Sequence, residues 1–211
     1  MNLPNRLTLL RLGLVPAFMV FMFVDHLSTR ILALIIFIIA SITDWIDGKV
    51  ARETGTVTVI GTFLDPLVDK MLICTALVGF VELHELHIPA WMVVLIIGRE
   101  FLITGLRSLA AKRGIVIAAE KGGKFKTASQ ITSIILILMI LIFHSLLEFQ
   151  PNAAWVLSFH SSSFGHSFTR ILDHLPYGLV LLTTALTLFS GYLYIRKYRD
   201  LLNREFRMNA G

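Results

Sequence analysis

The sequence predicts an all-α integral membrane protein with six transmembrane helices preceded by an amphipathic interfacial helix. Of the 211 residues, 55% are hydrophobic and 16% are charged, whereas soluble domains carry about 25% charged residues. The mean hydropathy is +0.76, and the apolar residues form long runs instead of short alternating segments. Several of these runs reach the roughly 20 residues that a helix needs to cross a bilayer.

We expect one domain over residues 1–211, with its elements in the following order. Residues 1–11 should form the interfacial helix, because their leucines recur at helical spacing while Arg6 and Arg11 fall on other faces. Six spans should then occupy 12–195, at 12–24, 30–50, 62–82, 89–110, 126–147 and 172–195. The longest outer loop should lie at 148–170, and residues 196–211 should form a basic cytoplasmic tail.

The distribution of charge predicts how the chain is oriented. If both termini lie on one side of the membrane, that side holds 16 of the 19 Lys and Arg residues. Because basic loops stay in the cytoplasm, we expect a multi-pass protein with both termini cytoplasmic. The net charge of +5 is explained by this topology, and no nucleic-acid partner is expected.

Cysteine and histidine exclude some kinds of site. The single cysteine, Cys74, lies in an apolar run, so neither a disulfide framework nor a Cys-based metal site is expected. All seven histidines fall toward the outer side of the predicted spans. This distribution argues against a His-rich zinc site near the aspartates.

Four aspartates stand out where membrane-spanning residues are expected. Asp44 and Asp47 are three residues apart at the end of the second span, and Asp65 and Asp69 are four apart at the start of the third. Either spacing places a pair on one helix face. Because the connection between these spans is short, all four carboxylates should meet just inside the cytoplasmic face.

Four carboxylates in such a pocket require a cation, because like charges and burial both raise carboxylate pKa values. Mg²⁺ or Mn²⁺ suits oxygen ligands and phosphates, so we expect one or two such ions and a bound phosphoanhydride. Gly48 and Gly61 would let a ligand approach the backbone closely. Arg52 could bind a phosphate through its guanidinium.

The aspartate motif resembles the signature of the CDP-alcohol phosphotransferase family. The sequence runs D-x-x-D-G-x-x-A-R from Asp44 to Arg52, and after eight residues G-x-x-x-D-x-x-x-D from Gly61 to Asp69. The resemblance implies a six-helix membrane fold, usually a homodimer, with a pocket facing the cytoplasm. It also implies transfer of a phosphatidyl-type group from a CDP-linked donor to an alcohol, with release of CMP.

The same resemblance implies roles for individual residues. Asp44, Asp47, Asp65 and Asp69 would hold two Mg²⁺ or Mn²⁺ ions, and Asp69 would also act as the general base. The resemblance implies a second group, which binds the cytidine diphosphate: Gly48, Ala51, Arg52 and Gly61. The amino-terminal element that closes over the nucleotide would include Asn5, Thr8 and Arg11.

Three further stretches are similar to the bacterial phosphatidylglycerophosphate synthases, a branch of that family. These are LDPLVDK (64–70), GREFLITGLR (98–107) and GKFKTASQ (123–130). The similarity implies CDP-diacylglycerol and sn-glycerol 3-phosphate as substrates, with phosphatidylglycerol phosphate and CMP as products. It also implies the bacterial inner membrane as the location, membrane lipids as partners, and an active site that faces the cytoplasm.

Basic residues outside the motif predict an acceptor that carries its own phosphate. Arg99 and Arg107 lie about two turns apart on similar faces of the fourth span, and Lys124 and Lys126 open the fifth. Arg99 lies in an apolar run, where an unpaired guanidinium is costly. Glu100 is adjacent but points elsewhere on a helix, so it is not expected to be its partner.

Two kinds of alternative remain open. Within the enzyme class, the acceptor could be inositol phosphate or phosphatidylglycerol. Outside it, the aspartates could bind a divalent cation for transport, which would require polar residues through the outer half of the spans. The sequence offers few of these: Thr132, Ser133, Thr183 and Thr184. A non-catalytic scaffold would leave the aspartates unexplained.

Overall fold

The computed structural model describes residues 3–54, 59–112, 121–149 and 151–199. For some of these only the backbone is described, namely 3–8, 44–54, 59–69, 112, 121–124, 154–155 and 160. The elements in chain order are α1 (Leu3–Phe23), α2 (Leu27–Thr54), α3 (Val59–Glu82), η1 (His84–Leu86), α4 (Ala90–Lys112), α5 (Lys121–Phe149), α6 (Ala154–Ser161) and α7 (Ser163–Lys197). All described elements are helical, so the predicted all-α class is confirmed.

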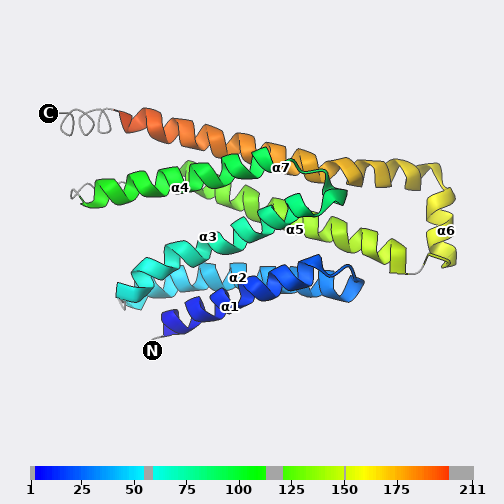
Figure 1. The fold of residues 1–211 in the computed structure, drawn as a ribbon, viewed down its shortest axis with the longest axis horizontal. Coiled ribbons are helices and arrows are strands. Elements are labelled where there is room, and N and C mark those ends of the chain that lie inside the picture. Colours follow the sequence, from blue (N-terminus) through cyan, green and yellow to red (C-terminus); the bar gives the residue numbers. More distant parts are fainter. Residues whose placement is uncertain (1–2, 55–58, 113–120, 150, 200–211) are drawn as a thin grey trace.

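The six long helices of the described chain run lengthwise beside one another, and the short α6 lies across one end (Figure 1). α1, α2 and α3 form one half of the view, and α4, α5 and α7 form the other, with α2 in contact with α5. The starts of α1, α3 and α5 and the ends of α2, α4 and α7 all lie at one end (Figure 1). This is the end that the charge distribution predicts to be basic; we call it the motif end.

The first helix is continuous across the predicted division between residues 11 and 12, and an interfacial position for residues 1–11 stays a prediction. α1 runs without a break from Leu3 to Phe23, so no boundary separates an interfacial helix over 1–11 from a span over 12–24. Arg11 is only 2% exposed, whereas Leu10 is 52% exposed. The guanidinium faces the bundle and the leucine faces outward, because in a lipid-embedded bundle the interior is the better place for charge.

The connection between α5 and α7 is also more ordered than a loop. Of the residues expected to form a loop at 148–170, 154–161 form α6 and 163–170 form the first turns of α7. The rings of Phe143, Phe159 and Phe168 pack in pairs, with centroids 5.7 to 6.1 Å apart. Ser162 caps α7 by accepting a hydrogen bond from the Gly165 amide at 2.9 Å. Aromatic packing and the cap together explain why the chain is helical here.

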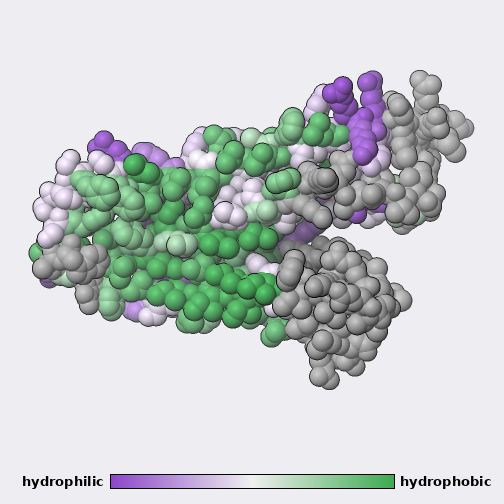
Figure 2. Space-filling view, turned by 180° about the vertical axis from the view of Figure 1, so that it is seen from behind, coloured by the Kyte–Doolittle hydropathy of each residue, from purple (hydrophilic) through white to green (hydrophobic). Residues whose placement is uncertain are grey.

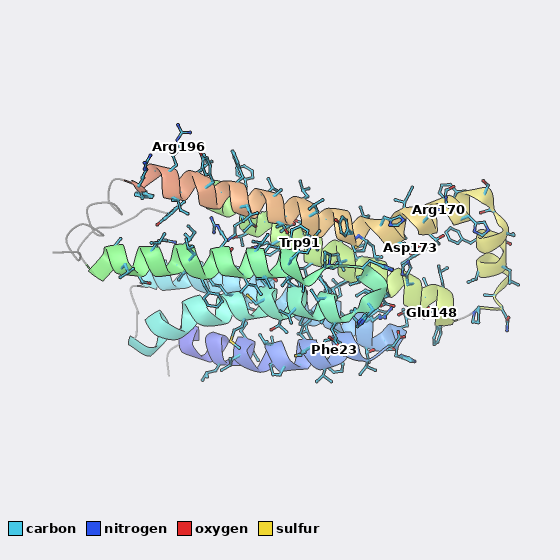
Figure 3. The ribbon with its side chains drawn as sticks, turned by 45° about the horizontal axis from the view of Figure 1, so that its top comes forward. Phe23, Trp91, Glu148, Arg170, Asp173 and Arg196 are labelled. Carbon is cyan, nitrogen blue, oxygen red and sulfur yellow. The ribbon has the colours of Figure 1, made fainter. Side chains whose placement is uncertain are left out.

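On the face that Figure 2 shows, apolar surface covers the middle of the described part and polar surface lies toward its ends. Two stretches, Phe125–Phe149 and Ser163–Lys197, are long and apolar enough to cross a membrane, while Leu9–Phe23 and Leu27–Thr43 are apolar but shorter. On α7, the residues between His174 and Arg196 carry no charge. Figure 3 shows Arg196 at one end of α7 and Asp173 toward the other.

A buried arginine links several elements at the end of the helix bundle opposite the motif end. Arg30 on α2 is 4% exposed, and its Nη2 lies 3.0 Å from Asp25 Oδ1 and 2.7 Å from Glu85 Oε1. Its Nη1 donates to the Leu141 carbonyl at 3.1 Å and to Ser145 Oγ at 2.8 Å. One guanidinium therefore ties α2 to the α1–α2 turn, to η1 and to α5.

Candidate functional site

The backbone brings the two aspartate pairs to matching heights. Asp44 lies ten residues before the end of α2 at Thr54, and Asp69 lies ten residues after the start of α3 at Val59. Asp47 and Asp65 lie seven and six residues from the same two helix ends. Because α2 and α3 run in opposite directions (Figure 1), Asp44 lies level with Asp69, and Asp47 lies level with Asp65 about one turn closer to the helix ends. Their side chains lie outside the described residues, so convergence of the carboxylates stays a prediction.

A cavity of about 240 Å³ lies next to these positions, between α1, α2, α3, α4 and α5. Its lining includes Ser41, three residues before Asp44, and Lys70, directly after Asp69. The cavity wall therefore continues along α2 and α3 into the aspartate motif. A ligand in the cavity and a ligand at the motif would be neighbours.

Charged side chains line the cavity from four helices. Arg11, Lys70 and Lys126 supply positive charge from α1, α3 and α5, and Glu100 supplies a carboxylate from α4. Lys126 is 5% exposed and forms an ion pair with Glu100. Lys70 donates to Thr104 Oγ1. Among the described lining residues cations outnumber carboxylates, so the cavity suits an anion.

The lining becomes apolar with increasing distance from the motif end. Leu77 on α3 and Ile96 on α4 lie about one turn farther toward the bundle middle than Cys74 and Glu100, respectively. Ile131 on α5 lies just beyond Gln130. The described lining thus forms a pocket with a charged mouth and an apolar floor. Cys74, expected to be a small core residue, is half-buried and lines this pocket.

Arg99 lies beside the cavity and is not part of its described lining. Its Nη2 donates to Ser190 Oγ on α7 at 3.0 Å, and its Nη1 lies 3.7 Å from Glu100 Oε1. A Cβ atom at Gly191 would meet Arg99 Cγ at 3.0 Å, so α4 and α7 pack closely there. The prediction that Glu100 would not partner Arg99 is wrong, because two long side chains can meet even when their Cβ atoms diverge.

Comparison with known proteins identifies the family. A family profile described as CDP-alcohol phosphatidyltransferase matches residues 1–161. The chain belongs to the CDP-alcohol phosphatidyltransferase family. The matched residues contain the aspartate motif and every described residue that lines the cavity. The family resemblance predicted from the motif is therefore confirmed.

Named relatives are similar over most of their length. A Bacillus subtilis protein named CDP-diacylglycerol–glycerol-3-phosphate 3-phosphatidyltransferase is 43% identical over 176 residues, 75% of this chain and 88% of the relative. A Pseudomonas fluorescens protein of the same name is 32% identical over 207 residues, covering 93% and 89%. One from Haemophilus influenzae is 37% identical over 139 residues, covering 63% and 73%.

In this phosphatidyltransferase the other predicted site residues fall into two groups. Arg107 is exposed on α4 and is not among the described cavity residues. The second group lies on helices at the motif end, with side chains outside the described residues: Asn5, Thr8, Gly48, Ala51, Arg52, Gly61 and Lys124. Of the residues predicted to bind the substrates, the structure places Arg11 and Lys126 together on the cavity.

Three cavity residues were missed from the sequence. Gln130 lies four residues after Lys126, so its helical spacing could have assigned it to the same site. Lys70 follows Asp69 directly, and its position next to the motif could have assigned it to the site. No sequence signal indicates Glu100, because its pairing with Lys126 depends on how α4 packs near α5.

The polar residues that a cation pathway would need are engaged elsewhere or exposed. Ser133 and Thr183 hydrogen-bond to each other at 2.8 Å between α5 and α7. Thr184 donates to the Val180 carbonyl at 2.7 Å, and Thr132 is exposed. None of them lines the cavity. Within the described residues, this favours a closed pocket over a transport path.

Proposed function

We propose that this enzyme transfers the phosphatidyl group of CDP-diacylglycerol to sn-glycerol 3-phosphate, forming phosphatidylglycerol phosphate and CMP in phospholipid biosynthesis. The observation that carries the proposal is the 43% identity to a relative named for this reaction, over 88% of that relative's length. The cavity supports it independently, since three cationic side chains line a small pocket beside the motif. Such a pocket suits an acceptor that carries a phosphate.

The proposal includes Mg²⁺ or Mn²⁺, held by Asp44, Asp47, Asp65 and Asp69. The donor set fits, because hard divalent cations prefer carboxylate oxygens. The backbone also fits, because it brings both pairs to matching heights on α2 and α3. When bound, such ions would neutralise charge on the diphosphate and on the departing CMP.

The protein's own residues would bind and orient the two substrates. Lys126 would hold the acceptor phosphate inside the cavity, with its position fixed by Glu100. Asp69 would accept the proton of the acceptor's primary hydroxyl, a role that typically contributes 10²–10⁴-fold. That oxygen would attack the phosphorus bearing diacylglycerol, and the bond to CMP would break. The cytidine diphosphate would lie along the motif residues of α2 and α3 and the start of α1.

The proposal places all six long helices across the bacterial inner membrane, with both termini in the cytoplasm. The two apolar helices and the apolar belt support membrane insertion. The gathering of basic segments at the motif end supports a cytoplasmic site. The proposal also includes a homodimer, as the family resemblance implies, surrounded by membrane lipids.

Release of CMP from CDP-diacylglycerol tests the function. Purified protein in detergent should release CMP with Mg²⁺ and sn-glycerol 3-phosphate, and should release less than about a tenth as much with inositol phosphate or phosphatidylglycerol. CMP release with only inositol phosphate, or with only phosphatidylglycerol, would show that this compound is the acceptor instead. No release with any of them, together with Mn²⁺ uptake by reconstituted vesicles, would favour the transport alternative.

A further inference from the structure

Gln130 lines the cavity with a buried side-chain amide whose N–H group has no described hydrogen-bond partner. Its side chain is 2% exposed and belongs to the cavity lining. Its Nε2 has no hydrogen-bond partner among the residues that the structure describes. Since buried amide donors are almost always paired, this group indicates an oxygen that is supplied by a ligand.

The position of Gln130 says which part of a ligand it would meet. It lies four residues after Lys126 on α5, on the same helix face and about 6 Å farther from the motif end. Lys126 carries the positive charge at the mouth, whereas Ile131 and Leu77 near Gln130 are apolar. A ligand held there would therefore place an anionic group at Lys126 and a neutral oxygen at Gln130.

We propose that Gln130 binds the secondary hydroxyl of the acceptor and selects for a phosphorylated polyol. This inference rests on the proposed function, because it assumes that the acceptor occupies the cavity. The amide nitrogen would donate to the hydroxyl oxygen at the middle carbon of glycerol 3-phosphate. The phosphate would lie at Lys126, and the primary hydroxyl would remain available to react at the aspartate motif.

A polyol phosphate explains the lining better than the other oxygen-bearing ligand in the reaction. An ester carbonyl of CDP-diacylglycerol could also accept from the amide, but two acyl chains would have to follow it into a cavity of about 240 Å³. Lys126, close to Gln130, would then pair with Glu100 but would bind no anionic group of the substrate. The acceptor satisfies both side chains with one small molecule.

The test compares glycerol 3-phosphate with 3-hydroxypropyl phosphate, which lacks only the secondary hydroxyl. The wild-type enzyme should prefer glycerol 3-phosphate by at least about tenfold in kcat/KM, the effect of one lost hydrogen bond to a buried donor. Gln130→Met keeps the length of the side chain and removes the amide. It should raise the KM for glycerol 3-phosphate about tenfold, and the preference should fall to within about twofold.

Thr132→Val is the matched control, because Thr132 is exposed on another face of α5. It should keep the wild-type preference and the wild-type KM for both acceptors. If Gln130→Met does not accumulate, Gln130→Leu also removes the amide without adding another polar group, and it should likewise lose the preference, because neither side chain can hydrogen-bond to the hydroxyl.

Each outcome separates the inference from the function. A wild-type enzyme that releases no CMP with glycerol 3-phosphate would overturn the proposed function. An active Gln130→Met enzyme that still prefers glycerol 3-phosphate tenfold would overturn only the role of Gln130. A rise confined to the KM for CDP-diacylglycerol would also overturn it, since that result would place the amide on the donor.

Discussion

Lys126 on α5 and Glu100 on α4 form an ion pair on the cavity wall. The two side chains are 6% and 14% exposed, so each neutralises a charge that would otherwise be buried. Arg99 Nη1 lies 3.7 Å from the same oxygen of Glu100, Oε1, that pairs with Lys126. Glu100 therefore interacts with one cation that lines the cavity and with one that packs against α7.

Removing Lys126 should weaken acceptor binding more than it slows the reaction. A charge-assisted hydrogen bond contributes about 1.5–3 kcal/mol, so Lys126→Met should raise the KM for glycerol 3-phosphate by at least about tenfold. The KM for CDP-diacylglycerol should change by less than about twofold. Steady-state CMP release with each substrate varied in turn measures both constants. Equal rises in both constants would contradict the assignment of Lys126 to the acceptor.

The Lys126–Glu100 pair should also show coupling in stability. Glu100→Gln leaves Lys126 buried without its partner, which for a buried pair costs about 3–5 kcal/mol. The double variant with Lys126→Met should cost less than the sum of the two single changes, because it removes both charges. The measurement is a double-mutant cycle, in which the free energy of unfolding in detergent micelles is determined for the wild type, the two single variants and the double variant. Additive costs would show that the pair is not coupled.

Arg107 should matter less than Lys126 for the acceptor. The sequence favoured both as phosphate ligands, but Arg107 is exposed on α4 and Lys126 is buried on the cavity. Exposed charges interact weakly through water, so Arg107→Gln should raise the KM for glycerol 3-phosphate by less than about threefold. If Arg107→Gln raised this KM as much as Lys126→Met does, the acceptor phosphate would have to bind near the end of α4 and not in the cavity.

Arg30 should be required for stability and not for catalysis. Replacing it with Met removes two ion pairs to partly exposed carboxylates and two buried hydrogen bonds, to Leu141 and Ser145, so Arg30→Met should destabilise the fold by about 1–3 kcal/mol, mainly through the buried groups left unpaired. The KM values of the enzyme that remains folded should not change. Arg170→Gln is the control, because Arg170 is exposed near the same end (Figure 3), and should change stability by less than about 0.5 kcal/mol.

The sequence predicted the helices well because their period and length are local properties. The predicted spans at 30–50, 62–82 and 89–110 lie within α2, α3 and α4 to within a residue or two. The family was also predictable, because its motif is a short continuous stretch. An interfacial position for residues 1–11 stays a prediction, because amphipathic spacing alone cannot tell a membrane surface from a polar cavity. Arg11 faces that cavity.

The cavity itself was harder to predict, because its residues come from five helices. Lys126 could be found from its charge and position, whereas Glu100 and Gln130 look like ordinary polar residues in their segments. Their importance depends on which helices pack together. The helix at α6 was missed for a similar reason, since it depends on contacts among Phe143, Phe159 and Phe168.

Substitution within the aspartate motif should abolish turnover and change the response to metal. Asp65→Asn keeps the shape of the side chain and removes one charged ligand, so CMP release should fall by at least about 10³-fold at saturating Mg²⁺. Chelation by EDTA should abolish wild-type release, and adding Mg²⁺ or Mn²⁺ should restore it. Residual activity in Asp65→Asn should require a higher metal concentration for half-maximal rate.

Asp173→Asn is the matched control for this prediction. Asp173 is 54% exposed, and its Oδ1 lies 3.5 Å from Nε2 of His144. It lies on the part of α7 away from the motif end (Figure 3). It should keep wild-type turnover and the wild-type metal requirement. If Asp65→Asn retained wild-type activity, or if EDTA had no effect, the carboxylates would have to serve another purpose. The ions could then no longer explain why the ends of α2 and α3 carry four aspartates.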